Sequence, residues 1–145
     1  MRRIQRDGSH EELIKSLTSG DQPLFKEIWR VLLFASAVGI SHGKRKPLKN
    51  VESGKSMPDT YFTTPSWPGY LHLIGITETG NSDILRFDEA NQERVLTSFE
   101  EHANAGLEII QEKILASATP LDAIILLMAE SEEKQPQGAN VAELI

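Results

Sequence analysis

Residues 24–49 read LFKEIWRVLLFASAVGISHGKRKPLK, in which a long apolar run leads directly into a short cationic one. The apolar run places hydrophobic side chains on nearly every side of a helix, which is typical of a helix buried in the interior of a protein. Pro23 suits the first position of this helix, and Gly39 suits its C-terminal cap. We therefore expect a buried helix to hold the cationic stretch at the surface.

Helix signals also occur on either side of this stretch. Ser9 and Glu12 form the S-x-x-E pattern of a capping box, which predicts a short helix over residues 10–18. Residues 68–78 predict a helix that ends at Gly80, although their β-branched side chains leave a strand as the alternative. Each segment would add one helix to the fold.

The C-terminal half contains the clearest amphipathic pattern, over residues 88–117, where apolar residues recur every three or four positions. Thr119 and Pro120 then provide a cap and a proline before a helix that is apolar on most faces, with Ile125 expected in the core. Together these patterns predict a mainly α fold. It would be a single bundle of about five helices with a long basic loop, and one short strand or hairpin at Tyr61–Thr64 is an option.

The composition limits the function classes. The chain has 145 residues, enough for one domain with a substantial core, and no cysteine, so disulfides and thiolate metal ligands are excluded. Its longest apolar runs are shorter than the roughly 18 residues that a membrane-spanning helix requires. These features predict a soluble, cytoplasmic protein without a membrane partner.

The net charge of −6 is distributed unevenly. Residues 1–55 contain 11 Lys and Arg against 6 Asp and Glu, whereas residues 56–145 contain 4 against 15. The basic residues are densest in residues 42–49, here called the basic loop, whose candidate binding residues are His42, Lys44, Arg45, Lys46 and Lys49. Such a loop can bind phosphate or an acidic protein surface. In the plainest interpretation it only remains solvated or pairs with acidic helices of the same chain.

No motif identifies a reaction. Gly54-Lys55-Ser56 resembles the end of a phosphate-binding loop, but Lys49 stands where the first glycine would be required. Asp59 and Glu132 belong to a nuclease-like set of residues, yet they lie in a loop and a solvated tail rather than on adjacent strands. The four histidines are scattered without a ligand spacing. We therefore expect no catalytic residue, no metal and no cofactor.

The composition changes towards the C-terminus. Residues 1–131 are predicted to form the helical domain, and residues 132–145 a flexible acidic tail. Val141, Leu144 and Ile145 would form an apolar stripe on a helix that is too short to be stable alone. These three residues are therefore candidates for binding a partner, with a frayed chain end as the alternative.

The chain resembles the family of DNA-phosphorothioation (Dnd) system-associated protein 4 in the run Phe34-Ala35-Ser36-Ala37-Val38-Gly39, followed by Gly43-Lys44-Arg45-Lys46-Pro47-Leu48. The resemblance continues in the same order through Glu78-Thr79-Gly80, Ile84-Leu85 and the run from Phe99 to Ile110. It covers most of residues 2–130 and leaves the tail outside. It implies a bacterial protein encoded beside DNA-modification and restriction genes, acting in defence against foreign DNA, with no assigned catalytic residues.

These observations favour a non-enzymatic accessory or adaptor subunit of an anti-phage defence system linked to DNA phosphorothioation. Its partners would be other proteins of that system, DNA contacted through the basic loop, or a second copy of the chain. A stand-alone DNA-binding regulator is the first alternative, although the net acidity and the lack of a clear recognition helix disfavour it. A metal-dependent nuclease, or another enzyme that uses Asp59 and His72, is the least favoured.

Overall fold

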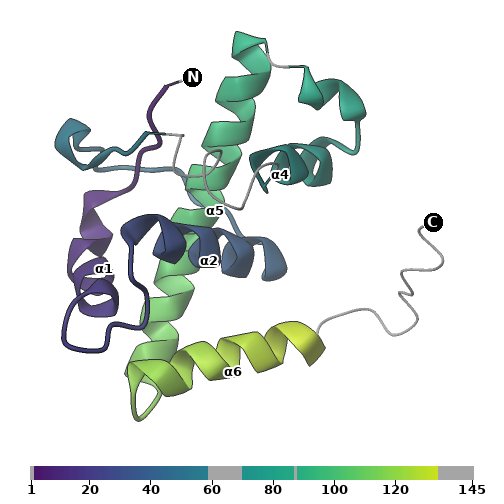
Figure 1. The fold of residues 1–145 in the computed structure, drawn as a ribbon. Helices are drawn as coiled ribbons and strands as arrows, with labels where there is room; N and C mark the ends of the chain where they lie inside the picture. Colours follow the sequence, from purple (N-terminus) through teal and green to yellow (C-terminus); the bar gives the residue numbers. More distant parts are fainter. Residues whose placement is uncertain (1, 59–69, 87, 134–145) are drawn as a thin grey trace.

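One long helix, α5 (Glu89–Leu115), forms the axis of the molecule, and the other helices pack around it (Figure 1). The computed structural model describes residues 2–58, 70–86 and 88–133. Within these residues the chain forms five α-helices and no β-strand, so the predicted mainly α fold is confirmed. The other four helices are α1 (Glu11–Thr18), α2 (Ile28–Ser41), α4 (Tyr70–Thr79) and α6 (Pro120–Glu133). Short 3₁₀ turns are η1 (Gly8–His10), η2 (Ser53–Lys55) and η3 (Ser82–Leu85).

The helices meet α5 at different levels. Helix α2 crosses its middle, α4 packs near its N-terminal half, and α6 folds back across its C-terminal end (Figure 1). Helix α1 packs against α2. Residues 2–7, here called the N-terminal segment, form two isolated antiparallel bridges with the segment after the basic loop. These bridges join Ile4 with Met57 and Asp7 with Val51. The short strand predicted at Tyr61–Thr64 lies outside the described residues.

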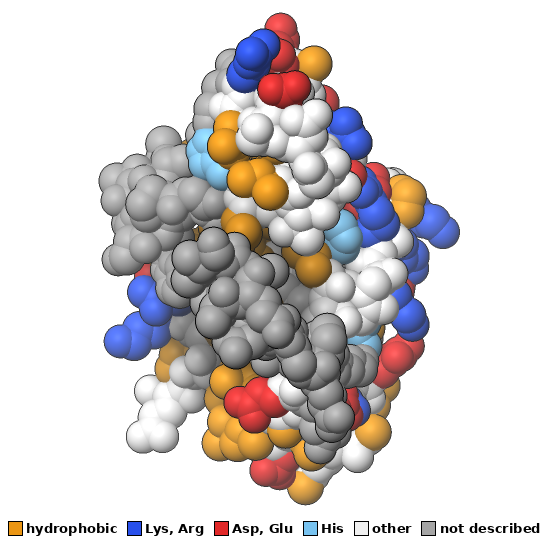
Figure 2. Space-filling view, turned by 90° about the vertical axis from the view of Figure 1, so that its right-hand side faces the viewer, with side chains coloured by type: hydrophobic (Ala, Val, Ile, Leu, Met, Phe, Trp, Pro, Cys, Tyr) orange, Lys and Arg blue, Asp and Glu red, His pale blue; other side chains and the backbone are white. Residues whose placement is uncertain are grey.

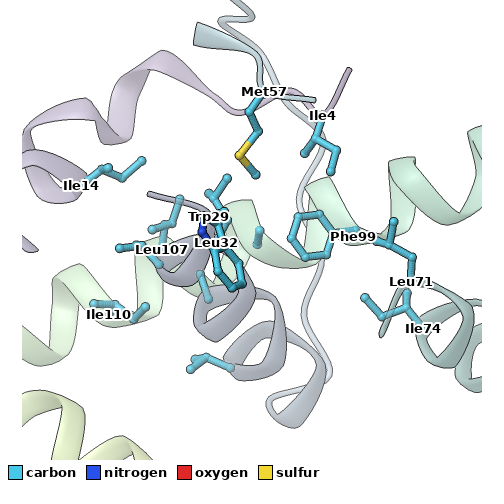
Figure 3. Close-up of a cluster of buried hydrophobic side chains, with 14 of the residues drawn as sticks. Ile4, Ile14, Trp29, Leu32, Met57, Leu71, Ile74, Phe99, Leu107 and Ile110 are labelled. Carbon is cyan, nitrogen blue, oxygen red and sulfur yellow. The ribbon is translucent and has the colours of Figure 1, made fainter. Parts of the chain in front are cut away.

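The core lies where α1, α2 and α4 converge on α5 (Figure 3). Leu32 of α2 is 2% exposed, and Phe99 and Leu107 of α5 are almost completely buried. Tyr70 of α4 packs edge-on against Phe99, with ring centroids 6.2 Å apart. The N-terminal segment adds Ile4 to the same cluster. Removing these aliphatic and aromatic side chains from water is the main favourable term in folding, so this cluster positions every element described below.

Gly39 does not cap α2, contrary to the prediction. The helix continues to Ser41, and Gly39 is buried where α2 crosses α5. A Cβ at Gly39 would lie 2.1 Å from the carbonyl oxygen of His102, and a Cβ at Gly106 would lie 1.8 Å from that of Ala35. Both distances are far below van der Waals contact, so the two glycines allow the helix backbones to approach each other closely.

The other end of α2 also differs from the prediction. The helix begins at Ile28 rather than at Pro23, because Phe25 donates its backbone N–H to the carbonyl oxygen of Leu17 at 3.0 Å and thereby joins the end of α1. The predicted helix over residues 10–18 is confirmed as α1, but its capping box is not formed. A contact with α1 therefore accompanies the later start of α2, and Asp7 rather than Ser9 caps the 3₁₀ turn that leads into α1.

The remaining helices follow the predicted patterns. Residues 70–79 form a helix, not the alternative strand, and Gly80 follows it with a φ of +64°. Asp88 caps α5 by accepting a hydrogen bond from the backbone N–H of Asn91 at 2.8 Å. The side chain of Thr119 accepts a hydrogen bond from the N–H of Asp122 at 3.2 Å and so caps α6.

Ile125 of α6 is not a core residue, contrary to the prediction. It is 54% exposed, whereas Ala123, Ile124 and Leu127 form the buried side of the helix. The sequence shows apolar residues on most faces of α6, but only one face meets the rest of the fold. Helix α6 itself continues to Glu133, so the predicted tail begins within its last turn, and residues 134–145 lie outside the described part of the chain.

Candidate functional site

The basic loop starts as a direct continuation of α2. Its first residue, His42, is held by the carbonyl oxygen of Val38, which accepts from the backbone N–H at 3.0 Å and lies 2.9 Å from the ring Nδ1. Gly43 then adopts a φ of +64°, which an L-residue with a side chain rarely takes. The N–H of Lys44 donates to the carbonyl oxygen of Gly39 at 2.9 Å. The end of the buried helix thus fixes the direction of the loop.

Helix α5 holds the middle of the loop. The backbone N–H of Lys46 donates to the carbonyl oxygen of Glu101 at 3.0 Å. The buried amide of Asn104 donates to the carbonyl oxygens of Lys46 at 3.1 Å and Pro47 at 3.2 Å. Its Oδ1 lies 2.7 Å from Nε2 of His10, which orients the amide. The loop is therefore bonded to α5 through its backbone, leaving its side chains to face other groups.

Asp7 holds the end of the loop. Its buried carboxylate accepts backbone N–H bonds from Lys49 at 2.8 Å and Asn50 at 3.2 Å, and from Ser9 at 2.9 Å on its own side. Burial would raise the pKa of Asp7, but these N–H donors outweigh it and hold the pKa well below its usual range. Asp7 therefore remains ionised and ties the N-terminal segment to the loop.

Asp7 lies on a segment that is itself fastened to α5. Arg2 makes a two-pronged ion pair with the buried Glu100, at 2.7 and 2.8 Å, and donates to Glu93 at 2.6 Å. The backbone N–H of Gln5 donates to Glu100 at 2.6 Å. Asp7, Asn104 and Glu100 are not among the site residues predicted from the sequence. Only the turn formed by Asp7 and Ser9 has a local signal, since the other bonds join residues far apart in the chain.

Two of the predicted binding residues are paired within the molecule. Arg45 donates to Glu78 of α4 at 2.7 Å and to Glu101 of α5 at 2.8 Å, and Lys46 pairs with Glu108 of α5. Burial alone would lower the pKa of Arg45, but its hydrogen bonds to the two carboxylates have the larger, opposite effect. The pKa of Arg45 is therefore raised. The pairing with acidic helices of the same chain, one of the alternatives drawn from the sequence, therefore accounts for these two cations.

Besides the exposed Arg45, the basic loop has two further exposed cations, Lys44 and Lys49. Neither forms an ion pair within the described part of the chain. His42 is half-buried and lines a pocket between α2 and α6. The five predicted residues thus lie together on one loop, where Lys44 and Lys49 are the cations without an ion pair in the described part of the chain. Val141, Leu144 and Ile145 lie outside the described residues.

The other chemical motifs have ordinary structural surroundings. Gly54 and Lys55 lie in the 3₁₀ turn η2 rather than before a helix, so the phosphate-loop geometry is not formed. The ring Nδ1 of His102 lies 2.8 Å from the carbonyl oxygen of Ser98. Residues 2–58, 70–86 and 88–133 contain no group of three or more His, Asp or Glu side chains arranged to hold a metal ion. Asp59 lies outside these ranges. In the same ranges, no helix combines the length and hydrophobicity required to span a bilayer.

Comparison with known families gives a match over nearly the whole chain. The family model described as DNA sulphur modification system-associated protein 4 matches residues 3–144. This range includes nearly all of the C-terminal tail, so the prediction that the tail lies outside the resemblance was wrong. Comparisons with curated proteins and with solved structures give no match. Since the family model spans nearly the whole chain, the protein belongs to the family of DNA sulphur modification system-associated protein 4.

Proposed function

We propose that the protein is a non-enzymatic adaptor in the cytoplasm that binds another protein of a DNA sulphur modification system and serves its defence against phage. Family membership supports the association with such a system. The single observation that carries the adaptor role is the rigid basic loop: its backbone is bonded to Gly39, Glu101, Asn104 and Asp7, while the side chains of Lys44 and Lys49 are exposed. Preorganised side chains of this kind lose little entropy on binding.

A protein partner fits the charges around the loop better than DNA does. The carboxylates of Glu78, Glu101 and Glu108 lie beside Arg45 and Lys46, so the loop presents both signs of charge rather than a continuous positive surface. Phosphate backbones favour an unbroken cationic surface, because each contact depends on releasing counterions. A mixed-charge surface instead suits a protein with complementary charges, where such pairs fix the partner and its orientation.

The non-enzymatic role is supported by how the buried polar side chains are used. Asp7, Glu100 and Asn104 are the buried side chains of the described residues that carry a carboxyl or an amide group. Each of them accepts from or donates to backbone groups of the N-terminal segment or the basic loop. Their hydrogen-bonding capacity is thus committed to holding the surface in place.

The tail would provide a second contact. We propose that Val141, Leu144 and Ile145 bind a partner as a short apolar stripe, because such residues are uncommon in a purely solvated chain end. A segment of this kind becomes helical only when a groove covers the stripe.

The adaptor role can be tested by co-expressing the tagged chain with the other proteins of its host's sulphur modification system and measuring their retention. The double variant Lys44→Glu/Lys49→Glu is expected to reduce retention of one of them at least roughly tenfold, because rim charges set encounter and orientation. It leaves the internal pairs of Arg45 intact. The control Lys15→Glu/Lys26→Glu makes the same charge change at other exposed lysines and should retain the partner.

Two outcomes would contradict this proposal. In the first, the parent chain retains no protein of the system. In the second, the parent binds a DNA duplex with a steep salt dependence that Lys44→Glu/Lys49→Glu removes, which would favour the DNA-binding regulator.

A further inference from the structure

Helix α6 is apolar on the side that faces solvent as well as on the side that faces the core. Leu121, Ile125 and Met128 are 51%, 54% and 58% exposed and follow one another at i, i+4 and i+7, so they form one stripe along the helix. Leu126 of the same helix is 47% exposed. Figure 2 shows hydrophobic side chains gathered at the lower end of the molecule, where α6 lies. A contiguous apolar face of this kind typically marks a binding surface.

A pocket adjoins this face. It has a volume of about 230 Å³, and its apolar lining comes from Phe34, Ala37 and Val38 of α2 and from Leu127 and Met128 of α6. Four polar residues also line it: Ser41, His42, Ser131 and Glu132. Clefts that bind drug-sized molecules are larger, roughly 300 to 1,000 Å³. A pocket of this size is better suited to one bulky apolar side chain, such as the anchor residue that a protein partner inserts.

The charges around the face indicate the kind of partner. Helix α6 contains Asp122, Glu130, Glu132 and Glu133 and no Lys or Arg, and Glu130 pairs with Lys113 of α5. A second copy of α6 would bring like charges together, and an anionic membrane surface would be repelled. We infer that the α6 face binds a basic amphipathic helix of a partner protein, with one large apolar side chain of that helix in the pocket. This inference rests on the proposed adaptor function and specifies its partner's chemistry.

The test uses a synthetic peptide of about 18 residues, long enough to populate a helix, with leucines at i, i+4 and i+7 and lysines on both flanks. A matched peptide carries glutamates in place of the lysines. Measured by fluorescence anisotropy on the full chain, the lysine peptide is expected to bind at least roughly tenfold more tightly than the glutamate peptide. Equal affinities would overturn the inference.

Variants locate the binding to α6. Ile125→Glu and Met128→Glu are each expected to weaken the lysine peptide at least roughly tenfold while leaving the melting temperature near that of the parent, because both side chains are largely exposed. Leu73→Glu is the matched control: Leu73 is 59% exposed on α4 and should not affect binding when replaced. Unchanged affinity in both α6 variants, or equal loss in Leu73→Glu, would refute the assignment.

Two further measurements test other occupants of the exposed face of α6. A dimer of the parent chain that Ile125→Glu converts to a monomer, measured by light scattering, would assign the face to a second copy. A chain truncated after Glu133 that binds the lysine peptide at least tenfold more tightly would assign it to the chain's own C-terminal segment. Either result overturns the inference. Retention of a system protein that Ile125→Glu and Met128→Glu leave unchanged would refute it while the adaptor function stands.

Discussion

At the scale of single residues, the informative side chains are buried and polar. Asp7, Glu100 and Asn104 each satisfy backbone groups of a segment distant in sequence. A buried carboxylate without such partners would cost several kcal/mol, so their burial depends on these bonds. These bonds join the N-terminal segment and the basic loop to α5 and to each other.

Asp7→Asn is expected to lower the free energy of unfolding at pH 7 by about 2 to 3 kcal/mol. The carboxylate accepts from three backbone N–H groups through both oxygens, whereas an asparagine must turn its NH₂ group towards some of these donors. Chemical denaturation with urea measures this difference. The exposure of Lys44 and Lys49 should increase as the loop loosens, which hydrogen exchange can detect.

The effect of Asp7→Asn should depend on pH. Since the folded-state pKa of Asp7 is lower than its ordinary value, the charge stabilises the fold above the unfolded-state pKa of about 3.9. That contribution is lost as the pH falls through the folded-state pKa. The stability difference between the parent and the variant should therefore shrink as the pH is lowered below about 4. A difference that stays constant from pH 7 to pH 3 would show that the charge of Asp7 is not the cause.

At the scale of elements, the close crossing of α2 and α5 determines where the basic loop begins. Gly39 and Gly106 face the backbone of the opposite helix, and Lys44 and Lys46 donate to carbonyl oxygens on these two helices. Any separation of α2 from α5 would therefore displace the loop as well. We therefore expect α2, α5 and the basic loop to move together.

Gly106→Ala is expected to destabilise the protein by at least about 2 kcal/mol, because the new Cβ would lie 1.8 Å from the carbonyl oxygen of Ala35 and α2 would have to move. In an isolated helix the same change would stabilise by about 1 kcal/mol, so the sign of the effect is diagnostic. Gly54→Ala is the control, since a Cβ at Gly54 meets nothing within 4 Å and the variant should keep or slightly gain stability. A stabilised Gly106→Ala variant would show that the helices do not cross so closely.

At the scale of the whole molecule, the uneven distribution of charge along the sequence leads to ion pairs between the basic N-terminal part and the acidic C-terminal part. Arg45 and Lys46 of the basic N-terminal part pair with carboxylates of α4 and α5 in the acidic C-terminal part. Exposed pairs of this kind contribute little to stability, about 0 to 1 kcal/mol each. Their main consequence is that much of the charge of the loop is balanced before any partner binds.

The C-terminal tail provides a prediction at the same scale. A chain truncated after Glu133, where α6 ends, should melt within about 2 °C of the full chain, because we expect the tail not to contribute to the core. The truncation should reduce binding to a protein of the sulphur modification system. A full-length Leu144→Ser/Ile145→Ser variant controls for chain length and should show the same loss. A truncated monomer that melts much earlier would place the tail in the core.

Features that depend on neighbouring residues could be predicted from the sequence. The helices α1, α4, α5 and α6 lie where the apolar patterns predict them, and Asp88 and Thr119 cap the last two as their sequence positions suggest. Both kinds of signal join residues within one or two helical turns. The cationic stretch after α2 and the family membership are likewise written in contiguous residues. Interactions between residues close in the sequence were therefore sufficient to predict the fold class and the position of the basic loop in the chain.

Features that depend on distant segments were decided only by the tertiary structure. Gly39 has the pattern of a cap, but the approach of α5 places it inside a helix crossing. Ile125 has the pattern of a core residue, yet no element of the described chain covers its side of α6. Arg45 belongs to a basic loop, but Glu78 and Glu101 from other helices balance its charge. Which face is covered and which charge is paired depends on long-range packing, and that packing has no signature in local residue spacing.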